Sequence, residues 1–117
     1  MIGWLLLGLL LYKRGEDMRL CQRHSAHEGL VEVARTLCLR NGEVMWGREG
    51  HSGTPSDVWI NPSCPEGGKV IGLYHTHPGG TTELSTQDIR AMLQAGLEHM
   101  CISDAHRVVC HRVREEW

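Results

Sequence analysis

Residues 69–100 read KVIGLYHTHPGGTTELSTQDIRAMLQAGLEHM, and this stretch decides the fold. Lys69–Tyr74 is a compact apolar run with few polar residues, which is typical of a central β-strand. Ser85–Met100 carries apolar residues at offsets of three and four, which predicts a helix with one buried face. Ser85 followed by Asp88 resembles a capping box, so we expect this helix to begin at Ser85. A strand, a glycine turn and a helix in this order indicate an α/β chain.

The flanking sequence adds strands on both sides of this unit. The β-rich run 32–47 contains Asn41-Gly42, a pair that tolerates positive φ at both turn positions and therefore predicts a β-hairpin. Ser25 followed by Glu28 resembles a second capping box, which predicts a short helix there. Further strands are predicted at 57–60, 100–103 and 108–113, the last two as a closing hairpin.

The cysteines leave one pairing open. If the closing hairpin pairs Ser103 with Val108, Cys101 faces Cys110 directly across the strands. The two residues then form either a disulfide or two reduced, buried thiols. Five cysteines are an odd number and include no C-x-x-C pair, which argues against a disulfide-stapled miniprotein and against a zinc ribbon.

Length and charge exclude several classes of protein. A chain of 117 residues supports one domain, and 41% hydrophobic residues exclude a disordered chain. The 12 Lys and Arg residues against 14 Asp and Glu give a net charge of −2, which offers no basic field for nucleic acid or a membrane surface. We divide the chain into an apolar N-terminal segment, residues 1–20, and a domain at residues 21–117.

The N-terminal run Met1–Tyr12, MIGWLLLGLLLY, is shorter than the roughly 20 apolar residues that span a bilayer. Its positive charges, Lys13 and Arg14, follow the run, and no small-residue cleavage site comes after them, unlike in a signal peptide. We expect a core strand or helix here, with a membrane-proximal anchor and an extension outside the fold as the alternatives. A cytoplasmic location is predicted.

Two histidines near the glycine turn have the spacing of metal ligands. Side chains at i and i+2 of an extended segment point to the same side, so His75 and His77 can present two imidazoles to one ion. Pro78 and the glycines after it turn the chain and allow the following helix to return its first turn, with Asp88, toward the same point. Two His and one Asp with an open position are typical of a catalytic zinc site, because structural sites are closed by four protein ligands.

His75-Thr-His77-Pro78 and Ser85-Thr-Gln-Asp88, with seven residues between His77 and Ser85, resemble the JAMM signature of the MPN-plus (JAB-domain) zinc metalloproteases. The resemblance covers roughly Ser25 to Val113. It implies a prokaryotic-type single-domain member with a mixed β-sheet flanked by helices, similar in layout to cytidine deaminases. It also implies one zinc ion per chain and hydrolysis of peptide or isopeptide bonds, with protein or peptide substrates that include conjugates of ubiquitin-like or sulfur-carrier proteins.

The resemblance further implies a general base and an oxyanion donor. The base is a Glu at the head of the strand after the first helix, and Glu32-Val-Ala-Arg35 is similar to that pattern, although Arg35 stands where the family tends to have Gly. Glu28 is the alternative base, but a capping role explains it without catalysis. The Ser85 hydroxyl is the implied donor to the oxyanion.

The sequence also bears on two other classes of protein. A non-catalytic MPN-type scaffold or binding module is the main alternative, and such relatives generally lack the intact His, His, Asp set. A zinc deaminase needs H-x-E with P-C-x-x-C, and neither motif is present. The remaining six histidines are predicted to have no catalytic role, although His51 lies in a loop that could line a substrate groove. The sequence is compatible with a homo-oligomer.

Overall fold

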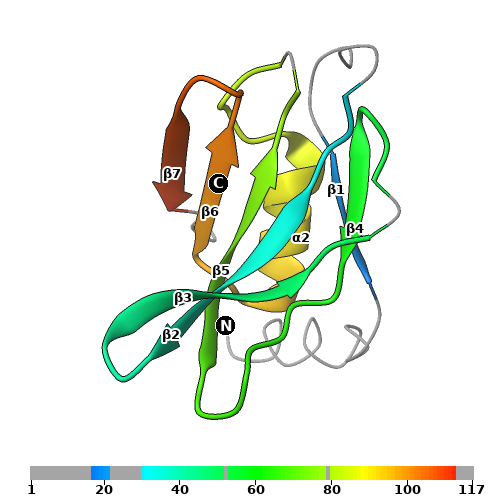
Figure 1. The fold of residues 1–117 in the computed structure, drawn as a ribbon. Helices are drawn as coiled ribbons and strands as arrows, with labels where there is room; N and C mark the ends of the chain where they lie inside the picture. The colour runs from blue at the N-terminus through cyan, green and yellow to red at the C-terminus, as the bar shows by residue number, and fades with distance from the viewer. Residues whose placement is uncertain (1–16, 22–29, 52, 79, 113–117) are drawn as a thin grey trace.

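The computed structural model describes residues 17–21, 30–51, 53–78 and 80–112. Its elements, in chain order, are β1 (Met18–Cys21), β2 (Ala34–Arg40), β3 (Glu43–Glu49), β4 (Asp57–Ile60), β5 (Lys69–Thr76), α2 (Thr86–Ala95), β6 (His99–Ser103) and β7 (Val108–Arg112), as labelled in Figure 1. Within these ranges α2 is the single helix. None of the described helical structure is both long and apolar enough to cross a bilayer.

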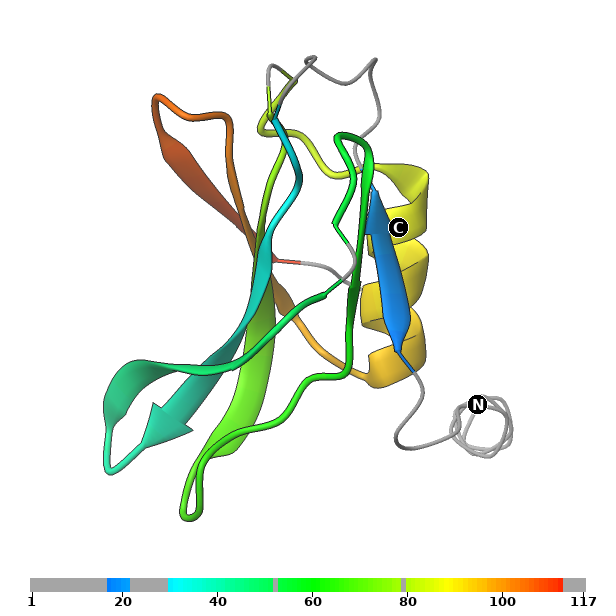
Figure 2. The same cartoon turned by 45° about the vertical axis from the view of Figure 1, so that its right-hand side comes forward.

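The strands form two sheets, a main sheet and a smaller one that lies beside the helix. Five strands make the main sheet in the order β3-β2-β5-β6-β7, and β1 pairs with β4 in a second, two-stranded sheet. β5 and β6 run parallel, as a strand–helix–strand crossover requires, and the other neighbours are antiparallel. Figure 2 shows α2 and the β1–β4 pair on the same side of the main sheet. The predicted α/β class with a mixed sheet is therefore confirmed, with one helix in the described part.

The core lies between the main sheet and the layer made by α2, β1 and β4. Met18 and Leu20 of β1 belong to it, so the folded unit includes residues that the sequence grouped with the N-terminal segment. Met1–Tyr12 and the predicted helix at Ser25–Glu28 lie outside the described residues. The buried core residues are Met18, Leu20, Ala34, Val58, Ile60, Leu73, Leu84, Ala91, Met92, Met100 and Ile102.

The predicted hairpin is confirmed, and the predicted helix is too long. Asn41 and Gly42 have φ values of 51° and 80°, the positive angles that a two-residue hairpin turn requires. α2 ends at Ala95 rather than at Met100, because Gly96 adopts the left-handed conformation, with φ 68°, and its N–H caps the last turn. Met100 lies in β6 and is buried in the core. The apolar spacing that predicted the longer helix therefore continues beyond the end of α2.

The described residues contain two disulfides. Ser103 pairs with Val108 in the β6–β7 hairpin, as predicted, and Cys101 is bonded to Cys110. Cys38 is bonded to Cys64 across 26 residues, which ties β2 to the loop before β5. The second disulfide was not predicted, because no local spacing relates these two cysteines. Cys21 is free.

Removing the Cys38–Cys64 crosslink is expected to destabilise the fold. Cross-linking a loop of this size restricts the unfolded chain and is worth about 3–4 kcal/mol. The double variant Cys38→Ala/Cys64→Ala is therefore expected to unfold at lower denaturant concentration than the parent when both are measured without reductant. Cys21→Ala is the matched control. Equal midpoints for the double variant and the parent would show that this disulfide does not form.

Candidate metal centre

The two histidines of the predicted site lie at the end of the central strand. His75 is in β5, where it pairs with Ala34 on one side and with Ile102 on the other. His77 follows the strand, and its N–H donates to the carbonyl of Ser103 over 2.8 Å. Both side chains are fully buried, and their ring centroids are 4.6 Å apart. The structure therefore places both imidazoles on one side of the chain, as the i, i+2 spacing predicts.

The first turn of α2 directs Asp88 at these rings. The capping box is formed, since Ser85 Oγ accepts from the Asp88 N–H over 3.0 Å and the Ser85 N–H donates to Asp88 Oδ2 over 3.3 Å. Asp88 Oδ1 also accepts from the backbone N–H of Cys21 over 3.1 Å. Oδ2 lies 3.0 Å from His75 Nε2 and 3.4 Å from His77 Nε2. The carboxylate is thus oriented toward both imidazoles by backbone groups of two elements.

Glu32 enters the same cluster two residues before β2 begins. Its side chain is buried, and Oε1 lies 3.0 Å from His75 Nδ1 and 3.9 Å from His77 Nε2. Its backbone N–H donates to the Thr54 carbonyl over 2.7 Å. A Cβ at Gly53 would lie 2.3 Å from the Glu32 carbonyl oxygen, so only glycine fits against this segment. Glu28, the alternative base, lies outside the described residues.

The donor set of this cluster could hold a metal ion. Glu32, His75 and His77 each offer a ligand atom, and these atoms all lie within 4.8 Å of one another. Tetrahedral zinc with N and O ligands at about 2.0–2.2 Å holds neighbouring ligand atoms roughly 3.3 Å apart. The distances of 3.0 and 3.4 Å from Asp88 Oδ2 to the two Nε2 atoms are close to that spacing.

Two polar atoms of the cluster are buried without a hydrogen-bond partner, Glu32 Oε2 and His77 Nε2. Such atoms are rare in folded proteins, because a buried polar group without a partner costs free energy. A cation bound at His77 Nε2 would remove that cost. His77 Nδ1 donates to the Thr81 carbonyl over 2.7 Å, so in the neutral imidazole Nε2 carries the lone pair that binds a metal ion.

Protonation within the cluster follows from burial and from close pairing. Burial lowers the pKa of His75, but hydrogen bonds to Asp88 and Glu32 outweigh it and raise this pKa to about 9. Burial raises the pKa of Asp88, yet its hydrogen bond to His75 and the nearness of both imidazoles hold this pKa well below its ordinary value. Burial raises the pKa of Glu32 above its ordinary value. Without a metal, His75 is therefore an imidazolium at neutral pH, with a proton on each ring nitrogen. A cation that binds Nε2 must displace the proton on that nitrogen.

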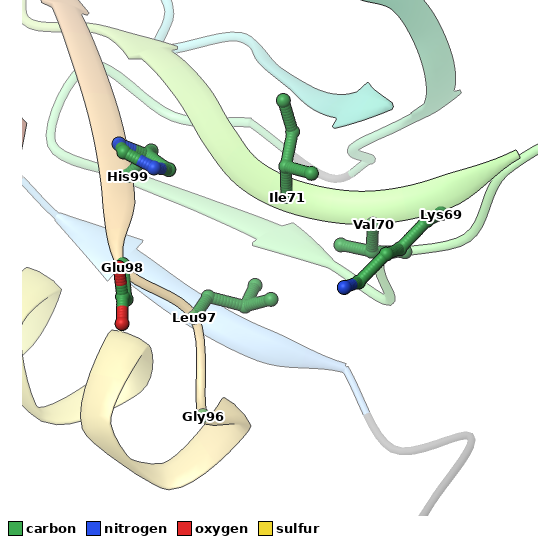
Figure 3. A pocket seen from close by; sticks show the side chains of 7 residues that line it. All are labelled: Lys69, Val70, Ile71, Gly96, Leu97, Glu98 and His99. Atoms are coloured by element: carbon green, nitrogen blue, oxygen red, sulfur yellow. The ribbon is translucent and has the colours of Figure 1, made fainter. Parts of the chain in front are cut away.

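A cavity of about 310 Å³ lies at the other end of β5 and contains none of the predicted site residues. Figure 3 shows it between Lys69, at the start of that strand, and Leu97 and His99, near the start of β6. It is therefore separate from the cluster around His75. The side chain of His51 is exposed, and its Nε2 contacts Asp17 Oδ2.

The backbone partners of the cluster were not predicted. The N–H of Cys21, the carbonyl of Thr81 and the carbonyl of Thr54 orient Asp88, His77 and Glu32, respectively. Their side chains carry no signal for this role, because a backbone group from any residue can serve. Gly53 is the one local signal in the sequence, because a glycine can mark a place where two backbone segments come close, as Gly53 and Glu32 do here.

No family model matches the chain, and no significant match to a curated protein or a solved structure was found.

Proposed function

We propose that this chain is a JAMM-type zinc metallohydrolase of the MPN/JAB kind that cleaves peptide or isopeptide bonds. The observation that carries the proposal is the buried cluster itself. His75 and His77 at the end of β5, Asp88 and Ser85 at the start of α2, and Glu32 before β2 lie together around two unpartnered polar atoms. One zinc ion per chain, held by His75, His77 and Asp88, accounts for this arrangement.

A bound zinc ion supplies a Lewis acid for the scissile carbonyl and lowers the pKa of a water molecule toward about 7. Glu32 accepts the proton of the attacking water and delivers it to the leaving amine, as general base and then general acid. Its Oε1 is fixed against His75, and its Oε2 is unpartnered and available for this transfer.

Ser85 can cap the helix and act on the substrate at the same time. Its Oγ accepts from the Asp88 N–H, which uses a lone pair and leaves the hydroxyl proton available as a donor. That proton stabilises the oxyanion that forms as water attacks the carbonyl. One such donor is worth about 3 kcal/mol in the transition state.

The proposed substrates are proteins or peptides, with conjugates of ubiquitin-like or sulfur-carrier proteins as the first class to test. Nucleic acid is not among them, because the net charge of −2 offers no basic surface. The cytoplasmic location stays a prediction from the sequence. The two disulfides favour an oxidising compartment, since thiols are kept reduced in the cytosol of most organisms.

The test combines metal content with hydrolysis. Purified protein is analysed for bound zinc, and release of product from a peptide and from an isopeptide-linked ubiquitin-like conjugate is followed before and after chelation. We expect one zinc per chain, hydrolysis that chelation stops, and recovery on adding zinc. Bound zinc without hydrolysis of either substrate would favour the non-catalytic scaffold. A chain that binds no zinc at neutral pH would overturn the proposal.

A further inference from the structure

The loop between β5 and α2 is held from two sides at consecutive residues. On one side the His77 ring donates its Nδ1 proton to the carbonyl of Thr81 over 2.7 Å. On the other side His111 of β7 donates from Nε2 to the carbonyl of Thr82 over 2.6 Å. The short path His111–Thr82–Thr81–His77 therefore connects the edge strand of the main sheet to the candidate centre.

His111 points toward this loop because of its register in β7. It lies directly opposite Met100, and residues that face each other in an antiparallel pair project to the same side of the sheet. Met100 is buried in the core beneath α2, so His111 projects to the side on which that helix lies. The preceding residue, Cys110, is bonded to Cys101, which fixes β7 on β6 at this position.

Thr82 lies between the two carbonyls that His77 and His111 contact, so both hydrogen bonds restrict its backbone. Its side chain is buried, and its Oγ1 accepts from Arg107 over 3.4 Å, so a second residue of the β6–β7 hairpin holds it. Without His111 the Thr82 carbonyl loses this donor, and the neighbouring peptide group that carries the Thr81 oxygen is held less firmly. His77 would then lose the acceptor that fixes its tautomer and the direction of its Nε2.

We propose that His111 is a positioning residue for His77, and acts on the candidate metal site through the Thr81 and Thr82 carbonyls. The inference rests on the proposed function only in taking His77 as a ligand of the ion. Residues that orient a metal-binding histidine typically contribute 10–100-fold to metal affinity. Because His111 acts through one further peptide unit, we expect its contribution to be about tenfold.

The variants separate positioning from a general structural role. His111→Phe keeps a ring of similar size and removes the donor, whereas His111→Gln keeps an N–H donor on a flexible chain. His106→Ala is the matched control, because His106 is exposed on the turn of the same hairpin. Zinc affinity is measured by competition with a chelator, and the absorption spectrum of the cobalt-substituted protein reports the ligand geometry.

We expect His111→Phe to bind zinc about tenfold more weakly with an altered cobalt spectrum, and His111→Gln to restore the parent values. His106→Ala is expected to match the parent. Unchanged affinity and spectrum in His111→Phe would overturn the inference, as would His111→Gln being as weak as His111→Phe. If the phenylalanine variant does not fold, His111→Ala gives the same comparison.

A second measurement needs no metal and separates this inference from the proposed function. In the metal-free parent, nitrogen–proton NMR of the imidazoles is expected to show His77 protonated at Nδ1, with slow exchange of that proton. In His111→Gln the exchange stays slow, and in His111→Phe or His111→Ala it becomes faster. A parent protonated at His77 Nε2, or exchange that is equal in all variants, would overturn the inference even if zinc binds. Failure of the parent to bind zinc would instead overturn the proposed function.

Discussion

Replacing Glu32 with glutamine is expected to abolish hydrolysis while leaving the zinc and the fold in place. Glutamine has the same shape, and its amide oxygen can still accept from His75 Nδ1, a contact that spans 3.0 Å in the parent. It cannot take up a proton, so the water loses its base and the leaving amine loses its acid. General acid–base catalysis typically contributes 10²–10⁴-fold, and we expect a loss of about that size in kcat. The measurement is kcat on the isopeptide substrate together with zinc per chain.

Two control variants make the result specific to this carboxylate. Glu28→Gln tests the alternative base, and Glu43→Gln removes an exposed carboxylate beside the Asn41-Gly42 turn. Both are expected to retain the parent rate. If Glu32→Gln is fully active and Glu28→Gln is not, the base is Glu28. If Glu32→Gln instead releases the zinc, Glu32 is a ligand, a role that its distance to the two imidazoles also permits.

Local signals in the sequence account for most of the elements that build the cluster. The apolar run at Lys69–Tyr74 predicted β5, and Ser85 with Asp88 predicted the start of α2 at the capping box that the structure contains. Asn41-Gly42 predicted the β2–β3 turn. These signals work because turns, caps and strand alternation depend on residues within a few positions of one another.

The features that were missed depend on contacts between distant segments. Met100 fits the helical spacing of Ile89 and Met92, yet it occupies the core from β6, because a buried strand and a buried helix face need the same side chains. The Cys38–Cys64 disulfide joins residues that come together only when β2 and the loop before β5 have packed. The role inferred for His111 has the same origin, since only the register of β7 brings it to Thr82.

Replacing His77 with alanine is expected to remove zinc from the protein without unfolding it. The variant loses one of two imidazoles, so zinc affinity is expected to fall by more than the roughly 10–100-fold typical of residues that only orient a ligand. The variant also loses the hydrogen bond from the ring to Thr81 and the packing of a buried side chain, so the stability of its metal-free fold is measured as well. The measurements are zinc per chain by elemental analysis and affinity by chelator competition.

Thermal unfolding with and without zinc distinguishes a lost ligand from a damaged fold. A ligand that binds only the folded state stabilises it by about 2.7 kcal/mol at 100 times its Kd, so the parent is expected to melt at higher temperature when zinc is added. His77→Ala is expected to melt at nearly the same temperature with and without zinc, at or below the melting temperature of the metal-free parent. His99→Ala, an exposed histidine in β6, is expected to respond to zinc as the parent does. One zinc per chain retained in His77→Ala would show that His77 is not a ligand, because an ion held by Asp88 and His75 alone would have lost one of its three protein donors and most of its affinity.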